Sequence, residues 1–437
     1  MIKYLFFIIS YFVLTKFAFA DNHEVAIADP VEITFIFNTL LFCIGGFLVM
    51  WMAAGFTMLE AGLVRSKNTV VICIKNVGLF SIAGTAYYLI GYNLMYAGVD
   101  GGYLGSIGVW SSGVNNPTDL VGQSYSPASD WFFQMVFVAT TASIVSGALA
   151  ERILIWPFFA FILVLTAILY PISGSWQWGG GWLSEMGFSD FAGSTIVHSV
   201  GGWAALTGAL ILGSRKGKYN TDGTANIMPG QSIPMATLGV WILWLGWFGF
   251  NGASQLALGS YIDADAVATI FANTSMAAAG GVLGAMILSR LIYGKTDISA
   301  TLNGAIAGLV SITAEPLTPV IGEAIIIGAI GGVLCMFGMK LLDKLKIDDV
   351  VGAIPAHLIA GVWGTLIVPF TNADTSYGIQ IIGILAFGLF TVIGSTIVWL
   401  ILKSTVGIRA SEEDEVYGLD LSEAGSIGYP EYTSKKK

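Results

Sequence analysis

Two histidines, His198 and His357, each lie inside an apolar stretch long enough to cross a bilayer. An ionisable side chain in hydrocarbon is costly unless it pairs with another group or lines a cavity, so such a residue marks a pathway or relay. No Lys, Arg, Asp or Glu lies close to either histidine along its stretch. The alternative is two separate histidines, each bonded to a backbone carbonyl. We expect instead that the two imidazoles share one hydrogen bond and turn their outer nitrogens toward a pore.

A second candidate group consists of aromatic residues and one serine near predicted outer helix ends. Phe250 and Ser254 are four residues apart and share one helix face. Phe137 and Phe250 both lie about two turns, roughly 10 Å, from the outer ends of their helices. With Trp178 they could form a vestibule that holds a small cation by cation–π attraction, with the serine as a hydrogen-bond acceptor. From spacing alone the stronger interpretation is an ordinary belt of interfacial aromatics, because Trp and Tyr are enriched at membrane interfaces.

Asp190 directly precedes the stretch that carries His198. An aspartate at this position caps a helix start and complements its dipole. Its charge could also raise the local concentration of a cation at the outer face. The two roles do not exclude each other.

The composition places the chain among polytopic membrane proteins. Hydrophobic residues make up 55% and charged residues 11% of the 437 positions, which excludes the soluble globular class. The 55 glycines suit closely packed transmembrane helices. A formal charge of −9, carried largely by loops and the tail, argues against a nucleic-acid partner.

The sequence gives no positive sign of a metal or cofactor. The cysteines Cys43, Cys73 and Cys335 lie in apolar runs and show neither metal-ligand spacing nor a disulfide framework. A membrane haem protein is a rival interpretation, because two histidines on neighbouring helices can ligate a haem. Two close helices leave no room for that ring, and we therefore expect no cofactor.

Residues 1–20 have the features of a secretory signal peptide. Lys3 precedes the apolar run LFFIISYFVL, and Ala18-Phe19-Ala20 matches the small-x-small rule for cleavage. The alternative is an uncleaved extra helix. Cleavage predicts a mature N-terminus outside the cytoplasm and removes the third histidine, His23, from consideration, since it falls just after the cleavage point.

Long apolar runs predict an all-α fold with eleven transmembrane helices. They lie near 36–63, 69–97, 130–150, 153–173, 191–213, 233–256, 264–292, 300–319, 321–342, 350–371 and 377–403. With the N-terminus outside, each predicted inside loop has lysine or arginine in or beside it, and the outside loops, including the long one over 98–129, have none. This asymmetry follows the positive-inside rule and places the C-terminus in the cytoplasm.

The eleven helices divide into two halves and one further helix. We expect a transmembrane domain over 21–406, with helices 1–5 at about 36–213, helices 6–10 at about 233–371, helix 11 at about 377–403, and a cytoplasmic tail over 407–437. His198 and His357 fall on the fifth and tenth helices, each with a glycine four residues on. Because five is odd, a five-plus-five repeat must be inverted, and such repeats form a site near the bilayer midplane.

Several long motifs resemble those of the Amt/Mep/Rh ammonium transporters, in the family's order and along nearly the whole chain. They are GFTMLEAGLVRSKN at 55–68, GALAERI at 147–153, WGGGWL at 178–183, DFAGSTIVH at 190–198, GWFGFNGAS at 246–254 and IDDVVGAIPAH at 347–357. The tail sequence SEEDEVYGLDLSEAGSIGYPEY resembles the terminus of bacterial Amt proteins. Gly352, Leu358 and Ser194 depart from common family residues and put the packing on the cytoplasmic side in doubt.

The resemblance implies a role for each matching residue. Trp178, Phe137 and Ser254 would recruit ammonium at the outer face, and Phe137 with Phe250 would form a stacked gate. His198 and His357 would be the twin histidines of the pore, Asp190 would support the recruitment site, and Trp247 would line the path. These assignments come from the matching motifs and not from spacing.

The resemblance also implies a function and partners. The chain would be an ammonium transporter, not an enzyme, that works in nitrogen uptake at a bacterial inner membrane, with ammonium or methylammonium as substrate. It would form a homotrimer, and the tail would couple the subunits to a GlnK-type P-II regulator at the cytoplasmic face. From composition alone the acidic tail would be a solvated, partly disordered end. An ammonium sensor with little flux is a rival interpretation, although such sensors usually carry a signalling domain and the tail here is short.

Overall fold

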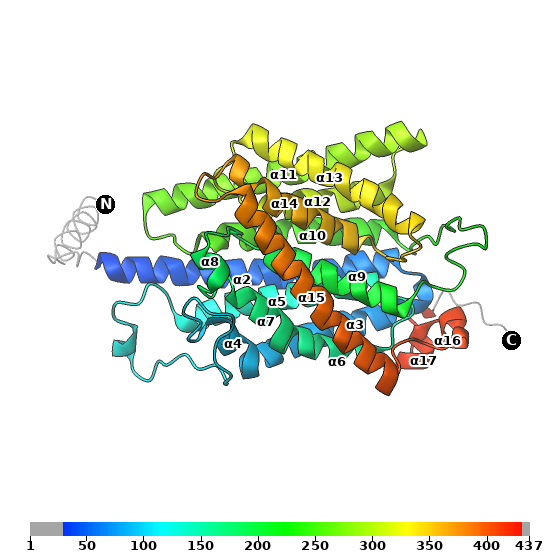
Figure 1. Ribbon diagram of the computed structural model, residues 1–437, viewed down its shortest axis with the longest axis horizontal. Coiled ribbons are helices and arrows are strands. Elements are labelled where there is room, and N and C mark those ends of the chain that lie inside the picture. The colour runs from blue at the N-terminus through cyan, green and yellow to red at the C-terminus, as the bar shows by residue number, and fades with distance from the viewer. Residues whose placement is uncertain (1–28, 431–437) are drawn as a thin grey trace, which may run out of the picture.

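The computed structural model describes residues 29–430 and is built from helices (Figure 1). The predicted signal peptide at 1–20 lies outside the described residues. The long helices are α2 Pro30–Leu63, α3 Thr69–Ala86, α5 Pro127–Ala148, α6 Ile155–Val164, α9 Val200–Leu212, α10 Ile233–Gly252, α11 Tyr261–Tyr293, α12 Ile298–Thr313, α13 Ile321–Lys344, α14 Ala360–Ile367 and α15 Tyr377–Thr405. The short ones are α4 Tyr92–Tyr96, α7 Tyr170–Ser175, α8 Trp182–Glu185, α16 Glu412–Tyr417 and α17 Leu419–Ala424.

Each of the eleven predicted spans corresponds to a helix or to a continuous helical rod. Within residues 29–430, nine rods are long and apolar enough to cross a membrane, and Ile298–Thr313 and Ile354–Phe370 are shorter apolar helices. The predicted all-helical polytopic fold is therefore confirmed. The eighth helix ends earlier than the predicted residue 319, because Pro316 and Pro319 interrupt the segment that follows it.

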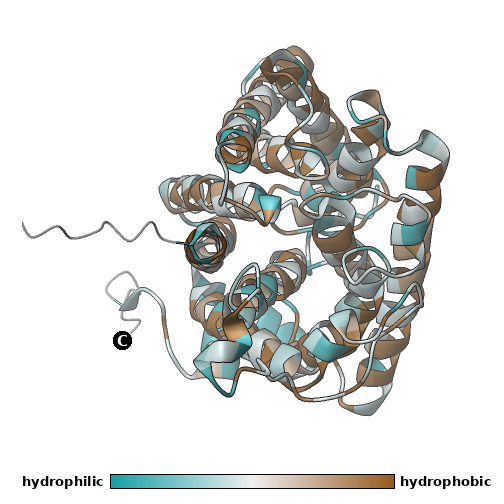
Figure 2. Cartoon of the chain, turned by 90° about the vertical axis from the view of Figure 1, so that its left-hand side faces the viewer, coloured by the Kyte–Doolittle hydropathy of each residue, from teal (hydrophilic) through white to brown (hydrophobic). Residues whose placement is uncertain are grey.

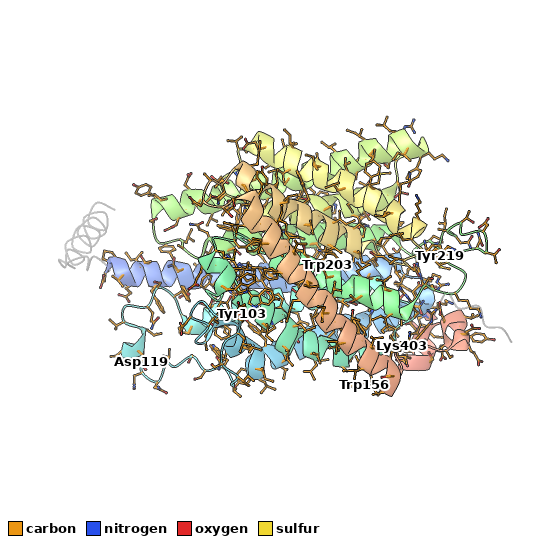
Figure 3. The ribbon with its side chains drawn as sticks, in the orientation of Figure 1. Tyr103, Asp119, Trp156, Trp203, Tyr219 and Lys403 are labelled. Carbon is orange, nitrogen blue, oxygen red and sulfur yellow. The ribbon has the colours of Figure 1, made fainter. Side chains whose placement is uncertain are left out.

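The two ends of the bundle separate the predicted outside and inside loops. Figure 1 shows α2 beginning at one end, α16 and α17 at the opposite end, and α15 crossing the other helices obliquely. In Figure 3, Asp119 of the predicted outside loop lies at the first end, and Tyr219 and Lys403 lie toward the other. The start of the first described helix and the tail thus lie at opposite ends of the bundle, as an odd number of membrane crossings requires.

The outer surface of the bundle is apolar, as a lipid environment requires. Large hydrophobic side chains are exposed along the peripheral helices, among them Phe47 of α2, at 62%, and Leu389 of α15, at 65%. Figure 2 shows hydrophobic residues along the helices at the edge of the bundle, interspersed with more polar ones. In water such a surface would associate, so it marks the region that lipid covers.

Two aspartates hold the starts of the two helices that contain His198 and His357 in the same way. Asp190 accepts hydrogen bonds from the backbone of residues 193–196, and Asp349 accepts them from Gly352 and Ile354. Gly193 and Gly352 both adopt a positive φ, of 106° and 80°, which favours glycine. A π-helical turn follows each, over Ser194–Ser199 and Ile354–Ile359. The helix that contains His357 therefore begins later than the predicted residue 350. The positive φ at position 352 explains why a glycine stands there.

A cluster of opposite charges joins four loops at the end that carries the tail. Arg215 contacts Glu151 at 3.1 Å and Asp348 at 2.8 Å, and Arg65 reaches Glu151 at 2.6 Å. Burial alone would raise the pKa of the Asp348 carboxyl, but hydrogen bonds and charge from Arg215 outweigh it and lower that pKa to about 2. The cluster accounts for Glu151 in the motif GALAERI and for Asp348 in the motif IDDVVGAIPAH.

The described part of the tail packs on the same end of the bundle. Arg409 binds the carbonyls of Leu212 and Ser214 and pairs with Glu415 at 2.7 Å. Farther along, the Asp420 carboxylate accepts a hydrogen bond from the backbone of Val71. Residues 407–430 are thus an ordered part of the inner face, as the family resemblance implies.

Glycines let α11, α12 and α13 pack with their backbones nearly touching. A Cβ placed on Gly281 would lie 2.2 Å from the Gly304 carbonyl oxygen, and one on Gly332 would lie 2.2 Å from the Gly281 oxygen. These distances are far below contact, so a methyl group would force the helices apart.

We predict that Gly281→Ala destabilises the protein by about 1–3 kcal/mol, the usual cost of overpacking a close contact. The measurement is the thermal unfolding midpoint in detergent. Gly322→Ala on α13 is the matched control, because a Cβ there meets nothing within 4 Å. Equal midpoints for the two variants would contradict this account of the packing.

Candidate functional site

The two predicted histidines meet at the centre of the bundle. His357 Nδ1 lies 3.2 Å from His198 Nδ1, and the rings are 0% and 2% exposed for His198 and His357. One Nδ1 therefore donates and the other accepts, and the tautomers of the two rings are linked. The predicted hydrogen-bonded pair is confirmed over two separately bonded histidines.

The pair forms because the two helices that contain the histidines approach each other closely. Each histidine lies in the π-helical turn that starts its helix, and each turn packs against the other helix. A Cβ on Gly202 would lie 2.6 Å from Leu358 Cβ, and one on Gly361 would lie 2.4 Å from the Ser194 carbonyl oxygen. The glycine four residues after each histidine is thus the contact that lets the rings touch.

Aromatic rings cover the outer side of the histidine pair. His198 stacks on Trp247 and Phe250, with ring centroids 4.9 and 5.2 Å apart. Phe137 lies on Phe250 at a centroid distance of 4.0 Å, and both rings are buried. Phe137 also meets Trp178, so the two phenylalanines lie between Trp178 and His198.

Above the phenylalanines a cavity of about 570 Å³ opens toward the outer loops. Trp178, Phe137 and Ser254 all line it, and Phe137 meets Trp178 edge-to-face at 5.8 Å. The Ser254 hydroxyl donates to the Phe250 carbonyl oxygen at 2.7 Å, which leaves its lone pairs for a donor in the cavity. The structure thus brings the three residues together in one vestibule and not in a dispersed belt.

Asp190 does not line the vestibule. It is 0% exposed, and both carboxylate oxygens accept backbone hydrogen bonds at the start of the His198 helix. Its own carbonyl accepts the indole N–H of Trp178 at 2.9 Å. Asp190 therefore fixes both the histidine helix and the tryptophan, and contact with a solute in the vestibule is not part of its role.

Sequence reasoning missed several residues of the site. Phe133 lines the vestibule and meets Phe137 edge-to-face at 4.8 Å, and its position one turn before Phe137 could have indicated it. Asp130 lines the same vestibule and accepts a hydrogen bond from Tyr92. On the inner side Phe56 lies 6.1 Å from His357, and no spacing signal connects these two residues.

The inner side of the pair leads to the charged end of the bundle. A narrow cavity beside His357 is lined by Phe56, Glu60, Asn303 and Val351, among others. Asn303 and Val351 also line a second cavity, of about 150 Å³, that reaches Arg215 and Asp349. The histidines thus lie between an outer vestibule and an inner chain of cavities. Among residues 29–430 no cluster of three or more His, Cys, Asp or Glu could hold a metal ion.

Known proteins with similar sequences are ammonium transporters. Residues 40–429 match the Ammonium Transporter Family. The chain is 39% identical to ammonium transporter Amt2 of Archaeoglobus fulgidus over 445 aligned positions, which cover 94% of this chain and 92% of that protein. It is 40% identical to the putative ammonium transporter sll1017 of Synechocystis, with 95% and 93% covered.

Solved structures with the same fold carry related names. A structure described as a sensor Amt protein has a TM-score of 0.84 and 35% identity, and covers 90% of this chain and 99% of its own. Candida albicans Mep2 has a TM-score of 0.77 and 25% identity, with 94% and 95% covered. On the sequence match and the shared fold, the chain belongs to the Ammonium Transporter Family and is a multi-pass membrane transporter, not an enzyme.

Proposed function

We propose that the protein recruits ammonium in its outer vestibule, deprotonates it and conducts ammonia along the histidine pair for nitrogen uptake. The observation that carries this proposal is the order of groups along the path. A polar, aromatic vestibule is followed by two stacked phenylalanines, and then by two neutral rings that share one hydrogen bond. Such a path suits a solute that arrives as a cation and crosses as a neutral molecule.

The vestibule favours ammonium over metal cations because ammonium donates hydrogen bonds. The free lone pairs of Ser254 can accept one such bond, and Trp178 and Phe137 offer cation–π contact. Potassium has the same charge and a similar size, but it gains less from these groups when it is stripped of water. Selectivity in this account begins with hydrogen-bond geometry.

The lumen below the phenylalanines favours the neutral form. The rings of Phe250, Trp247 and His198 stack on one another there, and all three side chains are buried. A bare cation in such surroundings would lose its hydration with no compensating charge. His198 Nε2 is buried without a hydrogen-bond partner among the described residues, and it can bond to ammonia or receive a proton.

The cellular setting in this proposal follows the family resemblance. The protein would lie in a bacterial inner membrane as a homotrimer, with the mature N-terminus outside and the tail in the cytoplasm. The packed tail over 407–430 supports a docking face for a P-II regulator of the GlnK type. An ammonium sensor is the competing function, because one solved structure of this fold is described as a sensor.

We predict that His198→Ala and His357→Ala each lower ammonium-dependent uptake at least tenfold, or remove its selectivity over potassium. Each change leaves the other ring without its partner in a buried site, and a buried polar group left unsatisfied costs about 1–3 kcal/mol. The measurement is radiolabelled methylammonium uptake by cells that lack their own ammonium transporters. Membrane abundance and thermal midpoint show whether each variant is folded. Full, ammonium-selective uptake by both folded variants would overturn the assignment.

We predict that Trp178→Leu and Ser254→Ala raise the half-saturating ammonium concentration about 5- to 30-fold. Each removes one contact worth roughly 1–2 kcal/mol to a bound cation. The measurement is uptake rate against ammonium concentration. Trp156→Leu is the matched control, since Trp156 is exposed at 79% on the periphery of the bundle, at the end opposite the vestibule (Figure 3). An unchanged half-saturation in both vestibule variants would place recruitment elsewhere.

A further inference from the structure

A buried carboxylate without a complete set of partners lies on the inner side of the histidine pair. Glu60 of α2 is 1% exposed, and its Oε2 accepts a hydrogen bond from Ser146 Oγ at 2.7 Å. Its Oε1 has no hydrogen-bond partner among the described residues. A buried acceptor left unbonded is costly, so this oxygen calls for an explanation.

The charge of Glu60 is balanced by a buried lysine. Lys75 of α3 is 0% exposed, donates to the Ser146 carbonyl oxygen at 2.8 Å and lies 4.8 Å from the Phe158 ring centroid. Ser146 therefore contacts both partners, the carboxylate through its hydroxyl and the ammonium through its carbonyl. A balanced pair can be buried in a membrane helix bundle, although hydrophobic residues would usually be cheaper.

Glu60 also lines the path. Glu60 and His357 line the same cavity, whose volume of about 10 Å³ is at the lower limit of what one water needs. Gly147 makes room there, because a Cβ at that position would lie 3.2 Å from Glu60 Cγ and 2.5 Å from Val351. Asn303 and Val351 line both this cavity and the larger inner one, which Lys218 and Asp343 also line.

We propose that Glu60 is the proton acceptor on the inner side of the histidine pair. This inference rests on the proposed function. Ammonium in the vestibule gives up one proton and becomes ammonia. That proton passes through the two imidazoles, and Glu60 Oε1 takes one from His357 through a single water. The O–H bond formed on the carboxylate then breaks to release the proton into the inner cavity, so one ammonia and one proton cross together.

The positive charge of Lys75 favours release of the proton from Glu60. When Glu60 is protonated, the positive charge of Lys75 is no longer balanced, and it disfavours keeping the proton on the carboxylate. The histidines lead back toward an apolar, closed lumen, whereas the inner cavity contains Asp343 and Asp349. The favourable route for the proton is therefore inward.

The test records the charge movement and the internal pH of the same proteoliposomes after an ammonium step. Glu60→Gln keeps the size of the side chain and can keep its contact with Ser146, but it cannot take a proton. We expect its current to fall at least tenfold relative to the unmodified protein, while ammonia that now enters without its proton makes the interior more alkaline than it becomes with the unmodified protein. Glu60→Asp retains a carboxylate and should recover part of the current.

Glu315→Gln is the matched control. Glu315 is also buried, at 7% exposure, but it binds Asn372 at the outer end of the bundle, away from the path. It should match the unmodified protein in both current and internal pH. Current in Glu60→Gln within twofold of the unmodified protein would overturn the relay, and so would a parallel loss of current and ammonia flux. Ammonia flux without current in the unmodified protein would overturn the relay and leave the proposed function standing. If the unmodified protein showed neither current nor ammonia flux, the relay and the proposed function would both be overturned.

Discussion

The hydrogen bond between His198 and His357 is the interaction on which the rest of the structure depends. Two polar rings can lie in the middle of an apolar bundle only if each satisfies the other. Their contact at 3.2 Å requires two helices that start inside the bundle, and each start is held by an aspartate and a left-handed glycine. The close glycine contacts at Gly202 and Gly361 serve the same requirement. These features recur in both halves of the chain, so one constraint explains residues that are far apart in sequence.

The groups along the path are graded by polarity. The vestibule combines aromatic faces, a serine hydroxyl and a nearby carboxylate, and the two phenylalanines then remove water before the histidines. On the inner side the polarity returns in steps, first with Glu60 and Asn303 and then with the charged loops. A solute that sheds its charge at the outer phenylalanines needs a proton route as well as an ammonia route. The paired rings and the unbonded oxygen of Glu60 provide the components of such a route.

The fold was largely predictable from the sequence, because apolar length and the placement of lysine and arginine report directly on membrane crossing. The pairing of the histidines was predictable for a similar reason, since neither ring had a partner on its own helix. The position of Glu60 beside His357 was not predictable from the sequence. α2 brings Glu60 there from a distant part of the chain, and no local sequence period links the two residues. The late start of the tenth helix also escaped prediction, since Gly352 has a positive φ and lies against Asn303, which comes from another helix. Local patterns therefore gave the helices, and tertiary packing decided which side chains share a cavity.

The most direct test of the central claim compares equal steps of ammonium and potassium on proteoliposomes that contain the unmodified protein, with current and internal pH recorded together. The account predicts a response to ammonium, as current, alkalinisation or both, and none to potassium at the same concentration. A potassium current comparable to the ammonium current would contradict it, because a path closed by stacked phenylalanines and neutral histidines offers a bare metal ion nothing in place of its water.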